Sequence, residues 1–210
     1  EVKARKLMDN VMMFAVFMSS AMAFGLAGVG ESFATWFYGD SFIRCGYFLV
    51  LLCPTIFFKG CAGALRTQYI IPTQKDKIYL VSLITGAIAN LILNTMLIPK
   101  MNGIGAIIGT IVAEFSVCFV QFFMIRKDIL IGVYMKDFVG FGIIGLAMYF
   151  VVRLLDGVSN VVILTIGIQI VVGALLYIVL GILYMIMIRK NPVLVNEGLK
   201  VLRVKYRVRG

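Results

Sequence analysis

Residues 78–125 read IYLVSLITGAIANLILNTMLIPKMNGIGAIIGTIVAEFSVCFVQFFMI, and this stretch decides the fold. It consists of two apolar runs, 78–98 and 103–125, each about as long as the roughly 20 helical residues that cross a bilayer core. The residues between them, 99–102, leave room only for a tight turn. The stretch therefore predicts two antiparallel helices that cross a membrane as a hairpin.

The rest of the chain has the same character. Hydrophobic residues make up 61% and charged residues 14% of the 210 residues, whereas soluble domains have about 25% charged residues. Four further runs of spanning length lie at 10–30, 45–65, 137–155 and 161–188. We therefore predict an all-α, polytopic membrane protein. It has a cytoplasmic lead-in (1–9), a domain of six transmembrane helices (10–188) and a basic cytoplasmic tail (189–210).

The net charge of +10 is distributed unevenly between the two ends of the predicted helices. Most of the 20 Lys and Arg residues lie before the first run, in the 66–77 and 126–136 connections, or in the tail. The exceptions are Lys59 inside the second run and Arg44, Lys100 and Arg153 at the opposite helix ends. The positive-inside rule then predicts that both ends of the chain are cytoplasmic. Charges placed in this way argue against a nucleic-acid partner.

No pattern typical of an enzyme or a metal site occurs in the sequence. Histidine, the commonest general base, is absent, and the four cysteines form no CxxC pair. We expect no catalytic residue, no metal and no cofactor, and interpret the cysteines as small apolar residues. After Pro192 the tail is either an amphipathic or alternating segment on an anionic leaflet, or a solvated segment.

Two charges inside predicted spans are candidates for transport or ion coupling. Glu114 lies in the middle of the fourth run and Lys59 in the second. An ionised residue at that depth costs about 2.5 kcal/mol or more unless it has a partner or a wet cavity. Counted from the outer helix ends, the two differ in depth by roughly 4–5 Å, which a lysine side chain can bridge. The sequence allows a structural ion pair, a titratable carboxylate coupled to ion movement, or Lys59 reaching the inner surface.

The third run carries a small and polar stripe in which Ser82, Gly86, Asn90 and Asn94 recur every four residues. Amide side chains in lipid need partners, so this stripe faces protein or water. Ser82, Asn90 and Asn94 either hold helices together or line a polar cavity for sugar hydroxyls. The Gly105–Gly109 step predicts close packing of the fourth helix against the third.

The connection between the second and third runs, 66–77, is polar, basic and aromatic. Arg66, Lys75 and Lys77 are candidates for contact with phosphate headgroups. The alternative is ordinary positive charge on the inner side of the membrane.

Residues 66–114, RTQYIIPTQKDKIYLVSLITGAIANLILNTMLIPKMNGIGAIIGTIVAE, resemble the polysaccharide flippases of the multidrug/oligosaccharidyl-lipid/polysaccharide exporter superfamily. The motifs that carry the resemblance are QYIIPT at 68–73, Gly86-Ala87 with Asn90 and Asn94, Ile98-Pro99, Gly105-Ala106 and Ala113-Glu114. Upstream, FGL at 24–26 and FYGD at 37–40 also fit.

This resemblance implies the C-terminal lobe of a flippase of roughly 12–14 helices, whose two lobes rock against each other. The implied activity is ion-coupled flipping of a lipid-linked oligosaccharide across the bacterial cytoplasmic membrane. The implied partners are membrane lipids, that substrate, a preceding N-terminal lobe and the polysaccharide polymerase machinery. The alternatives are an exporter of drugs or of cell-wall lipid precursors, and a membrane subunit that does not transport.

Overall fold

The computed structural model describes residues 2–129 and 131–188, which form six long helices and two short helical turns. The helices are α1 (Val2–Tyr38), α2 (Ile43–Leu65), α3 (Asp76–Met101), α4 (Gly103–Ile125), α5 (Ile131–Leu154) and α6 (Val162–Met187). The 3-10 turn η1 (Asp40–Phe42) follows α1, and the π-helix η2 (Arg66–Ile70) follows α2. All six long helices have the length and apolar composition to cross a membrane, so the predicted polytopic all-α fold is confirmed. The predicted tail lies outside the described residues.

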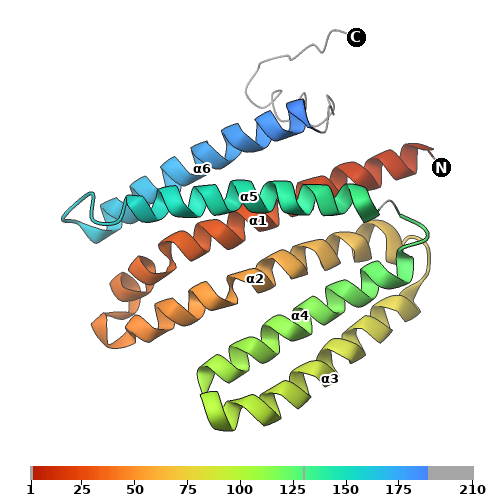
Figure 1. Cartoon of the computed structure of the whole chain (residues 1–210), viewed down its shortest axis with the longest axis horizontal. Helices are drawn as coiled ribbons and strands as arrows, with labels where there is room; N and C mark the ends of the chain where they lie inside the picture. Colours follow the sequence, from red (N-terminus) through yellow and green to blue (C-terminus); the bar gives the residue numbers. More distant parts are fainter. Residues whose placement is uncertain (1, 130, 189–210) are drawn as a thin grey trace.

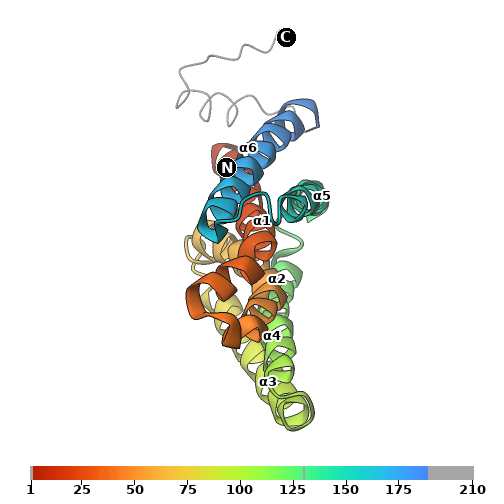
Figure 2. The same cartoon turned by 90° about the vertical axis from the view of Figure 1, so that its left-hand side faces the viewer.

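The six helices form an elongated row (Figure 1, Figure 2). Within it α3 packs on α4, α4 on α2, α2 on α1, and α1 on both α5 and α6. Consecutive helices run in opposite directions, so the α2–α3 and α4–α5 connections lie at the same end as the start of α1 (Figure 1). We call this the inner end, because the positive-inside rule predicts that it is cytoplasmic. Helix α3, at the edge of the row, is the least buried of the six.

The hairpin predicted for residues 78–125 is present as α3 and α4, but its turn is shorter than expected. Helix α3 continues through most of 99–102, and only Asn102 adopts a positive φ, of 49°. Asparagine tolerates this left-handed conformation better than most residues. At Gly105 the two backbones touch, since a Cβ there would lie 2.6 Å from the carbonyl carbon of Leu97. The expected close packing of α4 on α3 therefore depends on the absence of a side chain at Gly105.

Two other connections are more helical than the sequence predicts. Helix α1 begins at Val2, inside the expected lead-in, and continues to Tyr38, past the expected end of the first run at residue 30. The 66–77 connection, where no helix was predicted, starts with η2 and turns only afterwards, with Gln74 at φ 56°. Continuing the helix satisfies backbone groups that a loop would leave without partners. The apolar runs therefore mark the minimum extent of the helices.

The largest cluster of buried apolar residues in the described part of the chain lies away from α3, where the other five helices meet. Met13, Phe57, Cys118, Phe141 and Tyr184 belong to this cluster, one from each of α1, α2, α4, α5 and α6. This packing holds α2 and α4 side by side. On each side of this helix pair lies a groove, one toward α3 and the other toward α5.

Candidate functional site

The polar candidates gather in a groove between α2, α3 and α4. This polar groove has a volume of about 310 Å³ and is lined by Lys59, Ala62, Gly63, Arg66, Tyr79, Leu83, Glu114, Val117 and Gln121. Positions 59, 62 and 63 share one face of α2, and Arg66, the first residue of η2, continues that face one turn further. Three more, at positions 114, 117 and 121, follow the same spacing on α4. The groove therefore arises from two helical faces set against the start of α3.

Lys59 and Glu114 form an ion pair across the groove. The Nζ atom of Lys59 lies 3.2 Å from Oε1 of Glu114. The Lys59 side chain is 62% exposed and that of Glu114 is 24% exposed, so the pair sits on an open surface of these helices. The structure thus brings together the two intramembrane charges that depth counting placed near one level. Each charge inside a candidate membrane span thus has a partner of opposite sign, and both side chains remain partly exposed.

Arg66 places a second cation at the inner end of the polar groove. Its guanidinium donates a hydrogen bond of 3.0 Å to the Tyr79 hydroxyl and lies 5.2 Å from the centroid of the Tyr79 ring. The residue is the first of η2, and π-helical turns often occur at functional sites. Arg66, expected to contact headgroups, therefore faces the groove. With Lys59, Arg66 and Glu114, the groove has one more positive charge than negative.

Gln121 completes the groove and was not singled out from the sequence. Its Nε2 donates to the Ser82 hydroxyl at 3.1 Å, and its side chain is almost fully buried. Its Oε1 has no hydrogen-bond partner among the described residues. The sequence does contain an indication of its role, because Gln121 lies seven residues after Glu114 and so occupies the same helical face. Polar residues repeated on one face of an apolar helix indicate a shared polar environment.

The stripe on α3 lies against α4, and the cavity itself is lined by other residues. A Cβ on Gly86 would lie 3.1 Å from the carbonyl oxygen of Ala113 on α4. Asn94 donates a 2.8 Å hydrogen bond to the Asn90 side chain, and its own Oδ1 would meet a Cβ placed on Gly109. Ser82 is buried beneath Gln121. These contacts correspond to the helix-packing role that the sequence left open; the cavity-lining role of Ser82, Asn90 and Asn94 stays a prediction.

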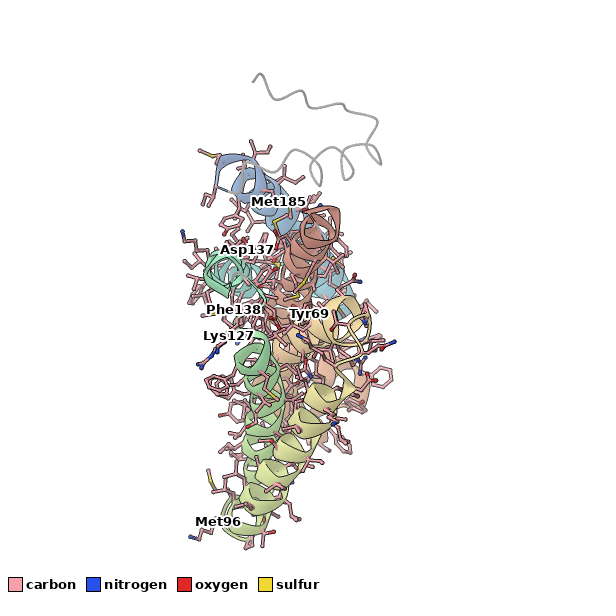
Figure 3. All side chains as sticks on the ribbon, turned by 90° about the vertical axis from the view of Figure 1, so that its right-hand side faces the viewer. Tyr69, Met96, Lys127, Asp137, Phe138 and Met185 are labelled. Atoms are coloured by element: carbon pink, nitrogen blue, oxygen red, sulfur yellow. The ribbon has the colours of Figure 1, made fainter. Side chains whose placement is uncertain are left out.

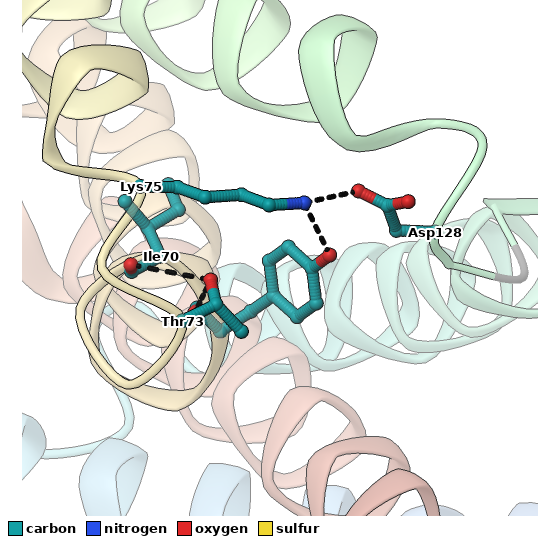
Figure 4. Close-up of polar contacts among 5 residues, drawn as sticks. Ile70, Thr73, Lys75 and Asp128 are labelled. Atoms are coloured by element: carbon teal, nitrogen blue, oxygen red, sulfur yellow. Dashed lines mark hydrogen bonds and ion pairs between the residues drawn. The ribbon is translucent and has the colours of Figure 1, made fainter.

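Lys75 ties two connections together at the inner end. Its ammonium group donates to Oδ2 of Asp128 at 2.7 Å and to the Tyr69 hydroxyl at 2.8 Å (Figure 4). These hydrogen bonds raise the pKa of Lys75, and the bond from Lys75 lowers the pKa of the Asp128 carboxyl. Lys77 is exposed. Of the three headgroup candidates, Arg66 and Lys75 have partners within the chain, whereas Lys77 forms no salt bridge among the described residues; contact of any of the three with a headgroup stays a prediction.

A second polar cluster lies at the opposite helix ends from the inner end, where α1, α5 and α6 meet. Arg153 contacts Glu31 at 3.0 Å and Asp156 at 3.5 Å, while the buried Gln169 donates to Asp156 at 2.7 Å. These contacts join α1, α5 and α6. Within residues 2–129 and 131–188, no three acidic, histidine or cysteine side chains are grouped in a way that could hold a metal ion.

The structure defines a polytopic, all-helical membrane fold with a charged groove in one half of its row. Among solved structures, the chain is similar to "Lipid II flippase MurJ, inward closed conformation", with a TM-score of 0.75 and 18% sequence identity. The match covers 87% of this chain and 39% of the flippase, so the chain spans less than half of the length of that protein. At this identity the likeness shows the fold alone. No protein-family model matches the sequence, and no curated protein does either.

Proposed function

We propose that this chain is one lobe, the C-terminal one, of a flippase that moves a lipid-linked oligosaccharide across the bacterial cytoplasmic membrane. The observation that carries the proposal is the charged polar groove on a fold similar to that of a lipid II flippase. In this mechanism the chain is a transporter and not an enzyme. The groove faces a second lobe, and the two lobes rock to open alternately to each side.

The groove suits a ligand that is both anionic and hydroxylated. Lys59 and Arg66 supply two cations, of which only Lys59 has a carboxylate partner among the described residues. The hydroxyl of Tyr79, which accepts a hydrogen bond from Arg66, can donate one to a sugar oxygen. Such a surface matches a phosphate-linked saccharide better than an aromatic drug, for which an apolar cavity is expected.

The Lys59–Glu114 pair also suggests how an ion gradient drives the transport cycle. Protonation of Glu114 removes the negative charge that holds Lys59, and the lysine then becomes available to an anionic substrate. Deprotonation restores the pair and displaces the substrate. This sequence of events couples one proton-binding group to one substrate-binding group over the 3.2 Å that separates them.

A cell-wall lipid precursor is the second candidate substrate, because the similar solved structure is described as a lipid II flippase. The test is deletion of the gene in the source organism, followed by complementation with the intact protein or its Glu114→Gln variant. Loss of surface polysaccharide in viable cells, restored by the intact protein alone, is the expected result. Cell lysis with accumulation of wall precursor would favour the second candidate. Full export by the Glu114→Gln variant at normal abundance would exclude a coupling role for Glu114.

A further inference from the structure

A second cavity lies on the opposite side of α2 and α4 from the polar groove. This phenylalanine groove, between α2, α4 and α5, has a volume of about 460 Å³. Phe58, Phe115, Phe119, Phe122, Phe123 and Phe138 line it, with Arg126 at its inner end. Viewed along the helices, Phe138 lies on the α4–α5 side of the row and Tyr69 on the α2–α3 side (Figure 3). The two grooves thus share two helices and open in different directions.

One wall of the phenylalanine groove is a regular ladder of rings along α4. Phe115 and Phe119 stack with ring centroids 5.8 Å apart, and Phe119 and Phe123 stack at 6.0 Å. The guanidinium of Arg126 lies 4.0 Å from the Phe123 centroid and continues the ladder. All three rings are about half exposed. The wall therefore presents a flat apolar strip that ends in a cation.

The length of this strip corresponds to one leaflet of a bilayer. Eleven residues separate Phe115 from Arg126, which is roughly 16 Å of helix at about 1.5 Å per residue. Half of a hydrocarbon core of about 30 Å is the depth that one acyl chain fills. A separate apolar cavity of about 350 Å³, containing Gly142 and Tyr149, continues into the other half of the membrane beyond Phe58 and Phe138.

The charges at the inner end are available to an anion. Neither Arg126 nor the exposed Lys127 forms a salt bridge with any carboxylate in the described part of the chain. The neighbouring Asp128 is held by Lys75 at 2.7 Å. A phosphate placed at headgroup level would meet two cations there, each worth about five-fold in affinity for an anionic lipid.

We propose that the phenylalanine groove binds one anionic phospholipid of the inner leaflet. One acyl chain lies along the ladder from Phe123 to Phe115, and the phosphate contacts Arg126 and Lys127. The lipid is a resident of the face opposite the polar groove and is not cargo. The proposal stands whether or not the protein transports a saccharide.

The test is native mass spectrometry of the intact protein, titrated with phosphatidylglycerol or with phosphatidylcholine of the same acyl chains. We expect tighter binding of phosphatidylglycerol, a loss of about five-fold in Arg126→Ala, and retention in Arg126→Lys. Lys100→Ala is the matched control, because it removes an exposed cation from the opposite end of the helices, in the last turn of α3, and it should leave the affinity unchanged.

Gly142→Phe identifies the length of the bound chain. A Cβ at Gly142 would meet no atom within 4 Å, so there is space at this position for a side chain that extends into the second cavity. Binding should be unchanged, since one acyl chain ends near Phe58. Lost binding in Gly142→Phe would mean an occupant longer than one leaflet, such as a polyprenyl chain, and would overturn the proposal. Equal affinity for both lipids, no effect of Arg126→Ala, or the absence of bound lipid would overturn it as well.

Discussion

The two grooves on either side of α2 and α4 are built from neighbouring residues with opposite chemistry. Phe58 and Lys59 are adjacent in sequence, as are Glu114 and Phe115, yet each pair is divided between the two grooves. Adjacent residues of an α-helix point about 100° apart, because a turn holds 3.6 residues. The rotation of α2 and α4 about their own axes therefore decides which surface is charged and which is aromatic.

This difference shows how a thin layer of two helices serves two environments. On the α3 side, the two charges that lie within candidate membrane spans, Lys59 and Glu114, are paired with each other. On the α5 side, stacked rings present only apolar surface until Arg126. The proposed substrate path and the proposed lipid-binding wall thus lie within one helix diameter of each other, about 10 Å.

The largest expected effect comes from a substitution that disrupts the packing of α3 against α4. A valine at Gly105 would press on backbone atoms of Leu97 and Ile98, 2.6 to 2.8 Å from its Cβ, and backbone cannot move aside as a side chain can. We expect Gly105→Val to lower the free energy of unfolding by about 3 kcal/mol, measured by equilibrium unfolding in SDS. Gly63→Val is the control, since its Cβ would meet no atom within 4 Å. Equal losses in the two variants would refute the close α3–α4 packing.

Breaking the ion pair should have the next largest effect. Lys59→Met leaves the Glu114 carboxylate alone at mid-membrane depth, at a cost of about 2–3 kcal/mol. The double variant Lys59→Met/Glu114→Gln should recover most of this loss, because no uncompensated charge remains. A double-mutant cycle in the same unfolding assay measures the coupling. Additive losses would show that the two charges do not interact.

A substitution at Gln121 compares the contribution of an amide hydrogen bond to stability with that of the ion pair. Gln121→Leu removes the 3.1 Å bond to Ser82 but also removes a buried oxygen that has no described partner. Interhelical hydrogen bonds in membranes average about 0.6 kcal/mol, and we expect a loss of that size or less. Phe119→Leu on the opposite face is the control, and it should change stability even less. A loss of unfolding free energy larger than that of Lys59→Met would show that the amide stabilises the fold more than the ion pair does, contrary to this prediction.

The smallest effect is expected outside the membrane, at the Lys75–Asp128 bond. Because the pKa of Asp128 is lowered from 3.8, its contribution is present above that pH and disappears as the pH falls through the lower value in the folded protein. The pKa of Lys75 is raised from 10.5, so its contribution is lost only as the pH rises beyond that raised value.

The melting temperature of the wild type should therefore slightly exceed that of Asp128→Asn at pH 7, and the two should converge in acid below pH 3.8. Lys127→Gln, a neighbouring change with no salt bridge among the described residues, is the control. A difference that persists unchanged in acid would exclude this bond as its source.

Much of the fold could be predicted because the length of an apolar run is a local property. Each of the six predicted spans corresponds to a helix, although the helices extend further than the runs, as at Tyr38. The Lys59–Glu114 contact was also accessible, because both helices run in the same direction and depth can be counted along each. The turn at Asn102 and the π-helix η2 were not predicted, since they depend on the backbone path.

The remainder of the site depends on rotation and register, which an apolar run does not encode. The contact between Gln121 and Ser82 joins residues 39 positions apart, and that between Lys75 and Asp128 spans 53. The phenylalanines of α4 were not singled out, because an aromatic ring within an apolar run suits a core, a neighbouring helix and lipid equally well. Only the packing of α2 against α4 and α5 separates these possibilities.

The most direct test compares one position in each groove at the same depth. Leu83 lies seven residues from Asp76 at the start of α3, and Phe119 lies seven residues before Arg126 at the end of α4. Both are therefore roughly 10 Å from the inner end of their helix. Both are open to a reagent, with 40% and 56% of their surface exposed.

The measurement is the rate at which a hydrophilic maleimide labels Leu83→Cys and Phe119→Cys in membrane vesicles, in the intact protein freed of its native cysteines. If the α3 side is a wet transport groove and the α5 side faces lipid, Leu83→Cys should react several-fold faster. Equal rates, or faster labelling of Phe119→Cys, would contradict the assignment of the two grooves and with it the proposed transport path.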